Sequence, residues 1–106
     1  MSEKELKNVQ ELFIKLRDLL IVYGGKYYRI QLNIIEDIID CVKSHWDNDK
    51  KTEYILKKYK RLYSPQGGLS DFYIHHEDYE ERLRLNKPLD EINDSLWNLI
   101  KQYIEK

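Results

Sequence analysis

The chain has 106 residues, of which 42% are hydrophobic and 35% are charged, and its 18 basic side chains nearly balance 19 acidic ones for a formal net charge of -1. That length supports one hydrophobic core, but it is too short for two ordinary domains or a doubly wound nucleotide-binding sheet. The small net charge also lacks the basic excess typical of a dedicated DNA- or RNA-binding protein. We therefore expect one folded domain over residues 1–106.

The sequence shows no feature of a secreted or membrane protein. Its N-terminal residues are polar and mixed in charge, and no segment approaches the roughly 20 apolar residues of a membrane span. The only cysteine, Cys41, lies in an apolar stretch, which predicts a buried thiol and fits a reducing compartment. We expect a soluble cytoplasmic protein that makes no contact with a membrane.

Two amphipathic helices are predicted in the first half of the chain. From about residue 3 to 23, apolar residues recur in steps of three and four, after a capping-box start at Ser2 and Glu5. Gly24–Gly25 then provides a left-handed stop. A second apolar pattern over residues 28–46 has a wide apolar face that includes Ile30, so this helix should be mostly buried.

The second half is less regular. Residues 47–49 offer side-chain oxygens that can cap a third helix, and residues 62–71 concentrate Pro, Gly and Ser in a turn-rich loop. Phe72–Tyr73–Ile74 is the one β-prone run, and we expect it to be an extended segment laid across the bundle, because no second strand is available to pair with it. Asn86 and Pro88 predict the start of the last helix.

The predicted fold class is therefore all-α. It is a small bundle of about four helices, with one irregular or extended segment between the third and the fourth. The short connections after the first two helices favour antiparallel neighbours. Monomer and homodimer both remain open.

Charge is segregated along the chain. Residues 50–63 hold six basic side chains and one acidic one, whereas residues 70–94 hold eight acidic and three basic ones. Such patches either steer a charged partner or form solvated helix faces that pair within the molecule. The basic segment, with its interleaved tyrosines, has a further interpretation as a nucleic-acid surface.

No arrangement of residues predicts a catalytic, metal or cofactor site. His75 and His76 are adjacent, whereas a helical zinc site needs histidines four residues apart. Gly67–Gly68 lacks the downstream Gly-Lys-Ser/Thr of a phosphate loop, so these glycines indicate positive φ or close backbone approach. We expect a protein without enzymatic activity, metal or cofactor.

Tyrosine is unusually frequent, with nine among 106 residues. Tyrosine offers a large contact area with few rotatable bonds and is favoured at protein interfaces. The alternative is that Tyr23, Tyr28, Tyr59 and Tyr103 line the core, which leaves Tyr54, Tyr73 and Tyr79 exposed. The excess of tyrosine and the segregated charge together favour a protein-binding role.

The C-terminal half resembles a family of small bacterial proteins described only as a domain of unknown function. The matching residues are Leu62–Tyr63, Gly67–Gly68–Leu69–Ser70–Asp71–Phe72–Tyr73–Ile74, Asn86, Leu89–Asp90 and Leu96–Trp97. The chain departs from that family by a charged insertion over residues 75–84. In this motif we expect Asp71 to accept backbone N–H bonds in the glycine-rich turn, Asn86 to cap the last helix and Trp97 to pack beneath the loop.

The resemblance implies no cofactor and no established activity, and proteins of this look and size include bacterial immunity proteins. We therefore expect a non-enzymatic immunity or antitoxin-like protein that binds and neutralises a cognate toxin domain. The alternative is a small regulatory nucleic-acid-binding protein that uses the basic helix 50–61. The residues expected to bind the protein partner are Asp71, Tyr73, Glu77, Asp78, Tyr79, Glu80 and Glu81.

Overall fold

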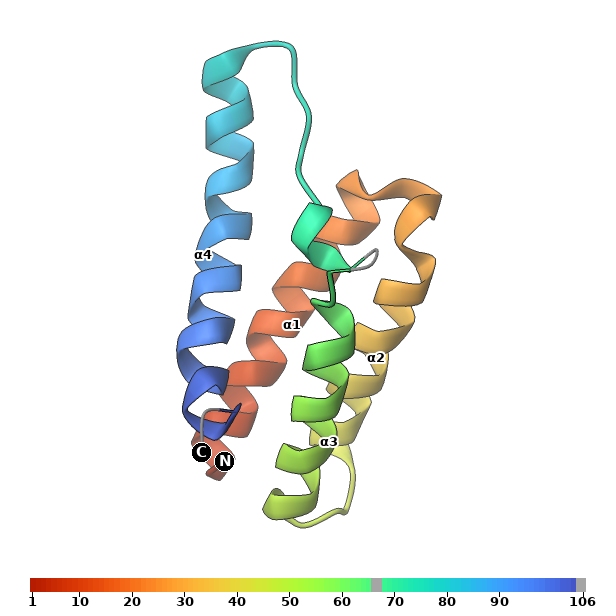
Figure 1. The fold of residues 1–106 in the computed structure, drawn as a ribbon, viewed down its shortest axis with the longest axis vertical. Helices are drawn as coiled ribbons and strands as arrows, with labels where there is room; N and C mark the ends of the chain where they lie inside the picture. The colour runs from red at the N-terminus through yellow and green to blue at the C-terminus, as the bar shows by residue number, and fades with distance from the viewer. Residues whose placement is uncertain (66–67, 105–106) are drawn as a thin grey trace.

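Four α-helices and two short 3-10 turns make up the fold in the computed structural model, which describes residues 1–65 and 68–104 (Figure 1). In chain order they are α1 (Glu3–Tyr23), η1 (Gly25–Tyr28), α2 (Arg29–Lys43), α3 (Asn48–Leu62), η2 (Leu69–Asp71) and α4 (Tyr79–Ile104). The described residues contain no strand, so the prediction of an all-α bundle is confirmed. α1 packs against both α2 and α4, and α3 packs on α2.

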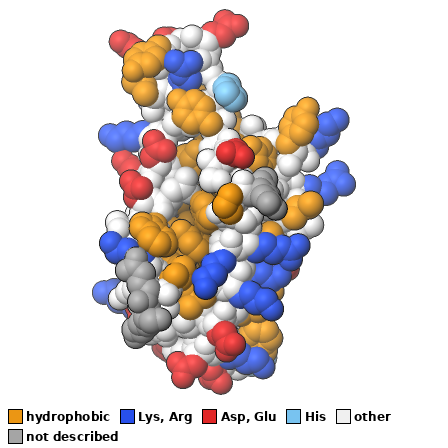
Figure 2. All heavy atoms as spheres, viewed as in Figure 1, with side chains coloured by type: hydrophobic (Ala, Val, Ile, Leu, Met, Phe, Trp, Pro, Cys, Tyr) orange, Lys and Arg blue, Asp and Glu red, His pale blue; other side chains and the backbone are white. Residues whose placement is uncertain are grey.

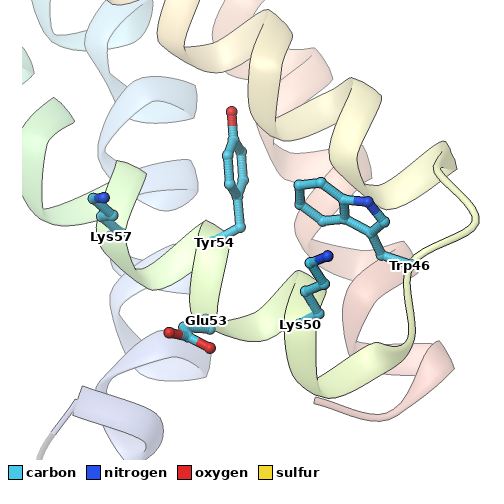
Figure 3. A pocket seen from close by; sticks show the side chains of 5 residues that line it. All are labelled: Trp46, Lys50, Glu53, Tyr54 and Lys57. Carbon is cyan, nitrogen blue, oxygen red and sulfur yellow. The ribbon is translucent and has the colours of Figure 1, made fainter.

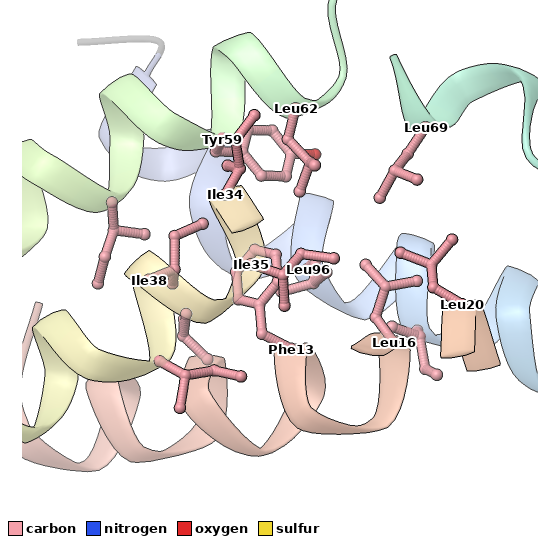
Figure 4. Packing of buried hydrophobic residues seen from close by; sticks show 14 of the residues in the cluster. Phe13, Leu16, Leu20, Ile34, Ile35, Ile38, Tyr59, Leu62, Leu69 and Leu96 are labelled. Atoms are coloured by element: carbon pink, nitrogen blue, oxygen red, sulfur yellow. The ribbon is translucent and has the colours of Figure 1, made fainter. Parts of the chain in front are cut away.

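The core is built from the apolar faces of all four helices. Phe13 and Leu16 of α1 point toward Ile35 of α2 and Leu96 of α4 (Figure 4). Cys41 is also buried, as expected, and burial raises the pKa of its thiol above the ordinary value. No helix within residues 1–65 and 68–104 is long and apolar enough to cross a membrane.

The predicted bounds of α1 and the cap of α3 are confirmed. Ser2 and Glu5 form the capping box, in which each residue's backbone N–H donates to the side chain of the other at 3.0–3.1 Å. The left-handed residue after α1 is Gly25, with φ at 60°. The side chain of Asp47 accepts a bond from the Lys50 N–H at 2.8 Å and starts α3.

α2 is shorter and less buried at its ends than its sequence pattern predicts. The prediction for Ile30 was wrong, because its side chain is 64% exposed at the start of the helix. The helix ends at Lys43, since the Ser44 hydroxyl and backbone N–H both donate to the Cys41 carbonyl. Trp46 therefore lies beyond the helix and is partly exposed.

The predicted start of the last helix was wrong. α4 begins at Tyr79, and Pro88 lies inside it, well past the first turn. The cap is Asp78, whose side chain accepts a bond from the Glu80 N–H at 3.2 Å and whose carbonyl accepts one from Arg82. The helix forms earlier because residues 79–85 are good helix formers with acidic residues in the first turn, where the helix dipole favours them.

Residues 72–78 connect η2 to α4, and we call this connection the strap. It is extended over residues 72–76 and bends at residues 77 and 78 into the helix. Phe72 and Ile74 are buried and Tyr73 between them is exposed, the alternation of a strand with one face on a core. The prediction of an extended segment over residues 72–74 is therefore confirmed. In Figure 1 the strap climbs beside α4 to the end of the molecule opposite the two termini.

Candidate protein-binding surface

A single buried amide holds the strap against α4. The Ile74 N–H donates to Asn86 Oδ1 at 2.9 Å, and Asn86 Nδ2 donates to the carbonyls of Ile74 and Arg82, both at 2.8 Å. Asn86 is only 3% exposed. It is thus a clamp between strap and helix and not the helix cap that its Asn-x-Pro setting suggests.

The lower end of the strap is fixed by close packing. The rings of Phe72 and Tyr28 make an edge-to-face contact with 5.1 Å between their centroids, which joins the strap to η1. Gly68, just before η2, lies so close to the backbone of Leu62 and Ser64 that a Cβ would come within 2.5–2.6 Å of their carbonyl oxygens. Gly68 therefore allows the two backbone segments to approach closely, as predicted. Gly67 lies outside the described residues.

The upper end of the strap and the first turn of α4 carry a group of carboxylates, Glu77, Asp78, Glu80 and Glu81, which we call the acidic end. The Asp78 carboxylate caps α4 by accepting a hydrogen bond from the Glu80 N–H. Glu81 accepts three hydrogen bonds from the Arg84 guanidinium, at 2.6, 3.1 and 3.2 Å, and these bonds lower the pKa of its carboxyl. The carboxylates of Glu77 and Glu80 are exposed and make no ion pair within the described residues.

The structure brings together most, but not all, of the residues predicted to bind a partner. Tyr79, 62% exposed, stands in the acidic end with the Arg82 guanidinium 5.3 Å from its ring centroid. Tyr73 is exposed on the outer side of the strap, where its ring meets that of His75. Asp71 is separate, because it lies in η2 at the opposite end of the strap.

Two further motif predictions were wrong. The Asp71 carboxylate is exposed and accepts no hydrogen bond from the described part of the chain. The backbone N–H of Asp71 instead donates to the Gly68 carbonyl. Trp97 is 42% exposed on α4 and is not packed beneath a loop.

The tyrosines divide between core and surface differently from the prediction. Tyr59 is buried, and Tyr28 and Tyr103 are partly buried, but Tyr23 is 45% exposed. Tyr54 is partly buried, whereas Tyr27 at the end of the bundle is exposed. Tyrosines with exposed rings therefore cluster at the end of the molecule that also carries the strap and the acidic end.

The two predicted charge patches lie on different parts of the surface. Figure 2 shows basic side chains gathered over α3, and acidic side chains beside hydrophobic ones at the projecting end of α4. Two of the lysines on α3 interact with α2. Lys51 Nζ donates to the Val42 carbonyl at 2.8 Å, and Lys58 Nζ lies 3.8 Å from Asp37 Oδ2.

A shallow hollow of about 240 Å³ lies beside the N-terminal half of α3 (Figure 3). Its aromatic wall is Trp46 and Tyr54, in edge contact at 5.5 Å. Lys50 lies 4.6 Å from the Trp46 ring centroid, and Lys57 and Glu53 complete the lining. This combination of rings and ammonium groups suits a planar anionic group.

Sequence reasoning missed an apolar groove of about 420 Å³ between α1 and α4. Its apolar walls are Leu19, Val22 and Tyr23 on α1, and Pro88 and Ile92 on α4. The apolar residues at positions 19, 22 and 23 indicate one wall of this groove in the sequence. The other wall was not predictable, because the sequence places Pro88 at the start of a helix and not within the helix that packs against α1.

His76 makes a hydrogen bond to the chain next to it. His76 Nδ1 accepts a bond from the Asp78 N–H at 3.0 Å, so its role here is local and structural. Over residues 1–65 and 68–104, no three His, Cys, Asp or Glu side chains are grouped so as to hold a metal ion.

Comparisons with protein-family models, curated proteins and solved structures found no match to this chain. The resemblance to the small bacterial family therefore stays an expectation that rests on the residues quoted for it.

Proposed function

We propose that this protein is a non-enzymatic inhibitor of the immunity or antitoxin type, which binds and neutralises a cognate toxin domain through the strap and the acidic end. The observation that carries the proposal is the Asn86 clamp. It fixes an irregular segment that is exposed on its outer side. A rigid surface binds with a smaller loss of conformational entropy than a mobile loop does.

Charge and side-chain type support the same surface. Glu77 and Glu80 are free to meet cationic groups, and Tyr73 and Tyr79 supply exposed aromatic area beside them. Carboxylates on such a surface can occupy a positively charged groove that normally holds phosphates, as in a nuclease domain. Aromatic side chains at the centre of a contact commonly supply most of the binding energy.

The experiment is co-expression with the product of the adjacent gene. The expected result is a stable one-to-one complex on gel filtration and restored growth of cells in which that product alone is toxic. Growth inhibition that persists in the presence of this protein would contradict the proposal.

The second candidate, binding of nucleic acid by α3, is favoured by the Trp46 and Tyr54 hollow with its lysines. It predicts affinity for single-stranded RNA that falls steeply with salt and is lost in Trp46→Ala. Absence of binding to a poly(U) oligonucleotide at low salt would remove it.

A further inference from the structure

We propose that the outer edge of the strap, at Tyr73 and His75, is a docking edge for an exposed β-strand of the partner protein, which would add to it by backbone hydrogen bonds. The inference rests on the proposed function and specifies how the partner is recognised. The inference follows from the directions in which the backbone N–H and carbonyl groups of residues 73–75 point.

The Asn86 side chain pairs with Ile74 as a neighbouring strand would. It accepts from the Ile74 N–H and donates to the Ile74 carbonyl, so both backbone groups of this residue face α4. In an extended chain, the N–H and carbonyl of one residue point to the same edge, and those of the residues on either side point to the other edge. The backbone groups of Tyr73 and His75 therefore face away from α4.

That outer edge is unpaired. Neither Tyr73 nor His75 makes a backbone hydrogen bond to any other part of the chain that the structure describes. Both residues are exposed, and their rings lie 5.7 Å apart on one side of the strap, as residues two apart on a strand do. In Figure 1 no other element runs along this edge in the upper part of the strap.

An unpaired extended edge is a template for strand addition, in which backbone bonds give affinity and alternate side chains give specificity. Charge identifies the kind of strand. The edge leads directly into Glu77 and Glu80, whose carboxylates are exposed. The partner segment is therefore an edge strand that carries lysine or arginine where it passes the acidic end.

A pair of substitutions at one position isolates the backbone contribution. His75→Pro and His75→Ala both remove the imidazole, but only proline removes the outward N–H. Proline is compatible with the fold here, because Ile74 before it is already extended. Circular dichroism and thermal melting of both variants establish that the bundle is intact.

The probe is a library of displayed β-hairpins whose exposed edge strand is randomised among Lys, Arg, Thr and Val. Hairpins selected on the wild-type protein are expected to bind His75→Ala within about threefold of wild type and His75→Pro about tenfold more weakly, since one hydrogen bond is lost and its acceptor is left unpaired. Equal binding to the two variants, or failure to select any hairpin, would overturn the inference.

The same two variants separate this inference from the proposed function. If the adjacent gene's product is neutralised equally by His75→Pro and His75→Ala, the protein is an inhibitor that does not use strand addition. If hairpins discriminate between the variants but no toxin is neutralised, the docking edge stands and the proposed inhibitory function is wrong.

Discussion

At the residue scale, Asn86 links the strap to α4. Its three hydrogen bonds satisfy both backbone groups of Ile74 and the carbonyl of Arg82. No apolar residue supplies such bonds, and a buried peptide group without a partner is costly. An asparagine two residues before a proline also has the pattern of a helix start. The sequence alone therefore predicts a helix cap at Asn86, which is wrong.

We predict that Asn86→Ala lowers the free energy of unfolding by about 3 kcal/mol, because it leaves the buried groups of Ile74 unpaired. Urea denaturation at pH 7 measures the loss. Asn98→Ala is the matched control, since Asn98 is exposed on the same helix. Equal stability of the two variants would show that the clamp contributes little.

At the element scale, the helices were predictable where periodicity and caps agree. The bounds of α1 and the cap of α3 follow from Ser2, Glu5 and Asp47. The start of α4 did not follow, because Asp78 and Pro88 both carry signals for a helix start. The Asp78 cap and the acidic first turn after it begin the helix earlier, and the helix continues through Pro88. The extended conformation of the strap was predictable from its short β-prone run. Its hydrogen bonds to Asn86 of α4 were not.

The capping box of α1 makes a pH-dependent contribution to stability. The Ser2 backbone N–H and the Tyr103 hydroxyl both donate to the Glu5 carboxylate, and these bonds lower the pKa of Glu5 below its ordinary value of 4.5. Because the folded-state pKa is depressed, the stabilisation is complete above about pH 5 and is lost as the pH falls through the lowered value.

We predict that the stability difference between wild type and Glu5→Gln is largest at neutral pH and shrinks between pH 5 and pH 3. Urea denaturation across this range measures the difference. Glu11→Gln, an exposed change on the same helix, should show a smaller and flatter one. A difference for Glu5→Gln that stays constant with pH would contradict the role assigned to its carboxylate.

At the scale of the whole molecule, the near-zero net charge conceals two opposed surfaces, the basic face of α3 and the acidic end. The segregation was visible in the sequence. Which charges remain available was not. Lys51 and Lys58 are engaged by Val42 and Asp37 of α2, which only the fold brings close, and Asp78 and Glu81 are engaged by neighbours within the first turns of α4. The fold also assembles exposed tyrosines from distant segments at the end that carries the strap.

The most direct test of the account is the affinity of the adjacent gene's product for Glu77→Lys/Glu80→Lys, which leaves the Asp78 cap and the Glu81–Arg84 pair in place. Its control, Glu3→Lys/Glu11→Lys, makes the same change in net charge on α1 and also alters one residue in the first turn of a helix. We predict that Kd rises at least about tenfold for the first variant, with a reduced salt dependence, and stays near wild type for the control. Equal affinity of the two variants would contradict the claim that the acidic end is the binding surface.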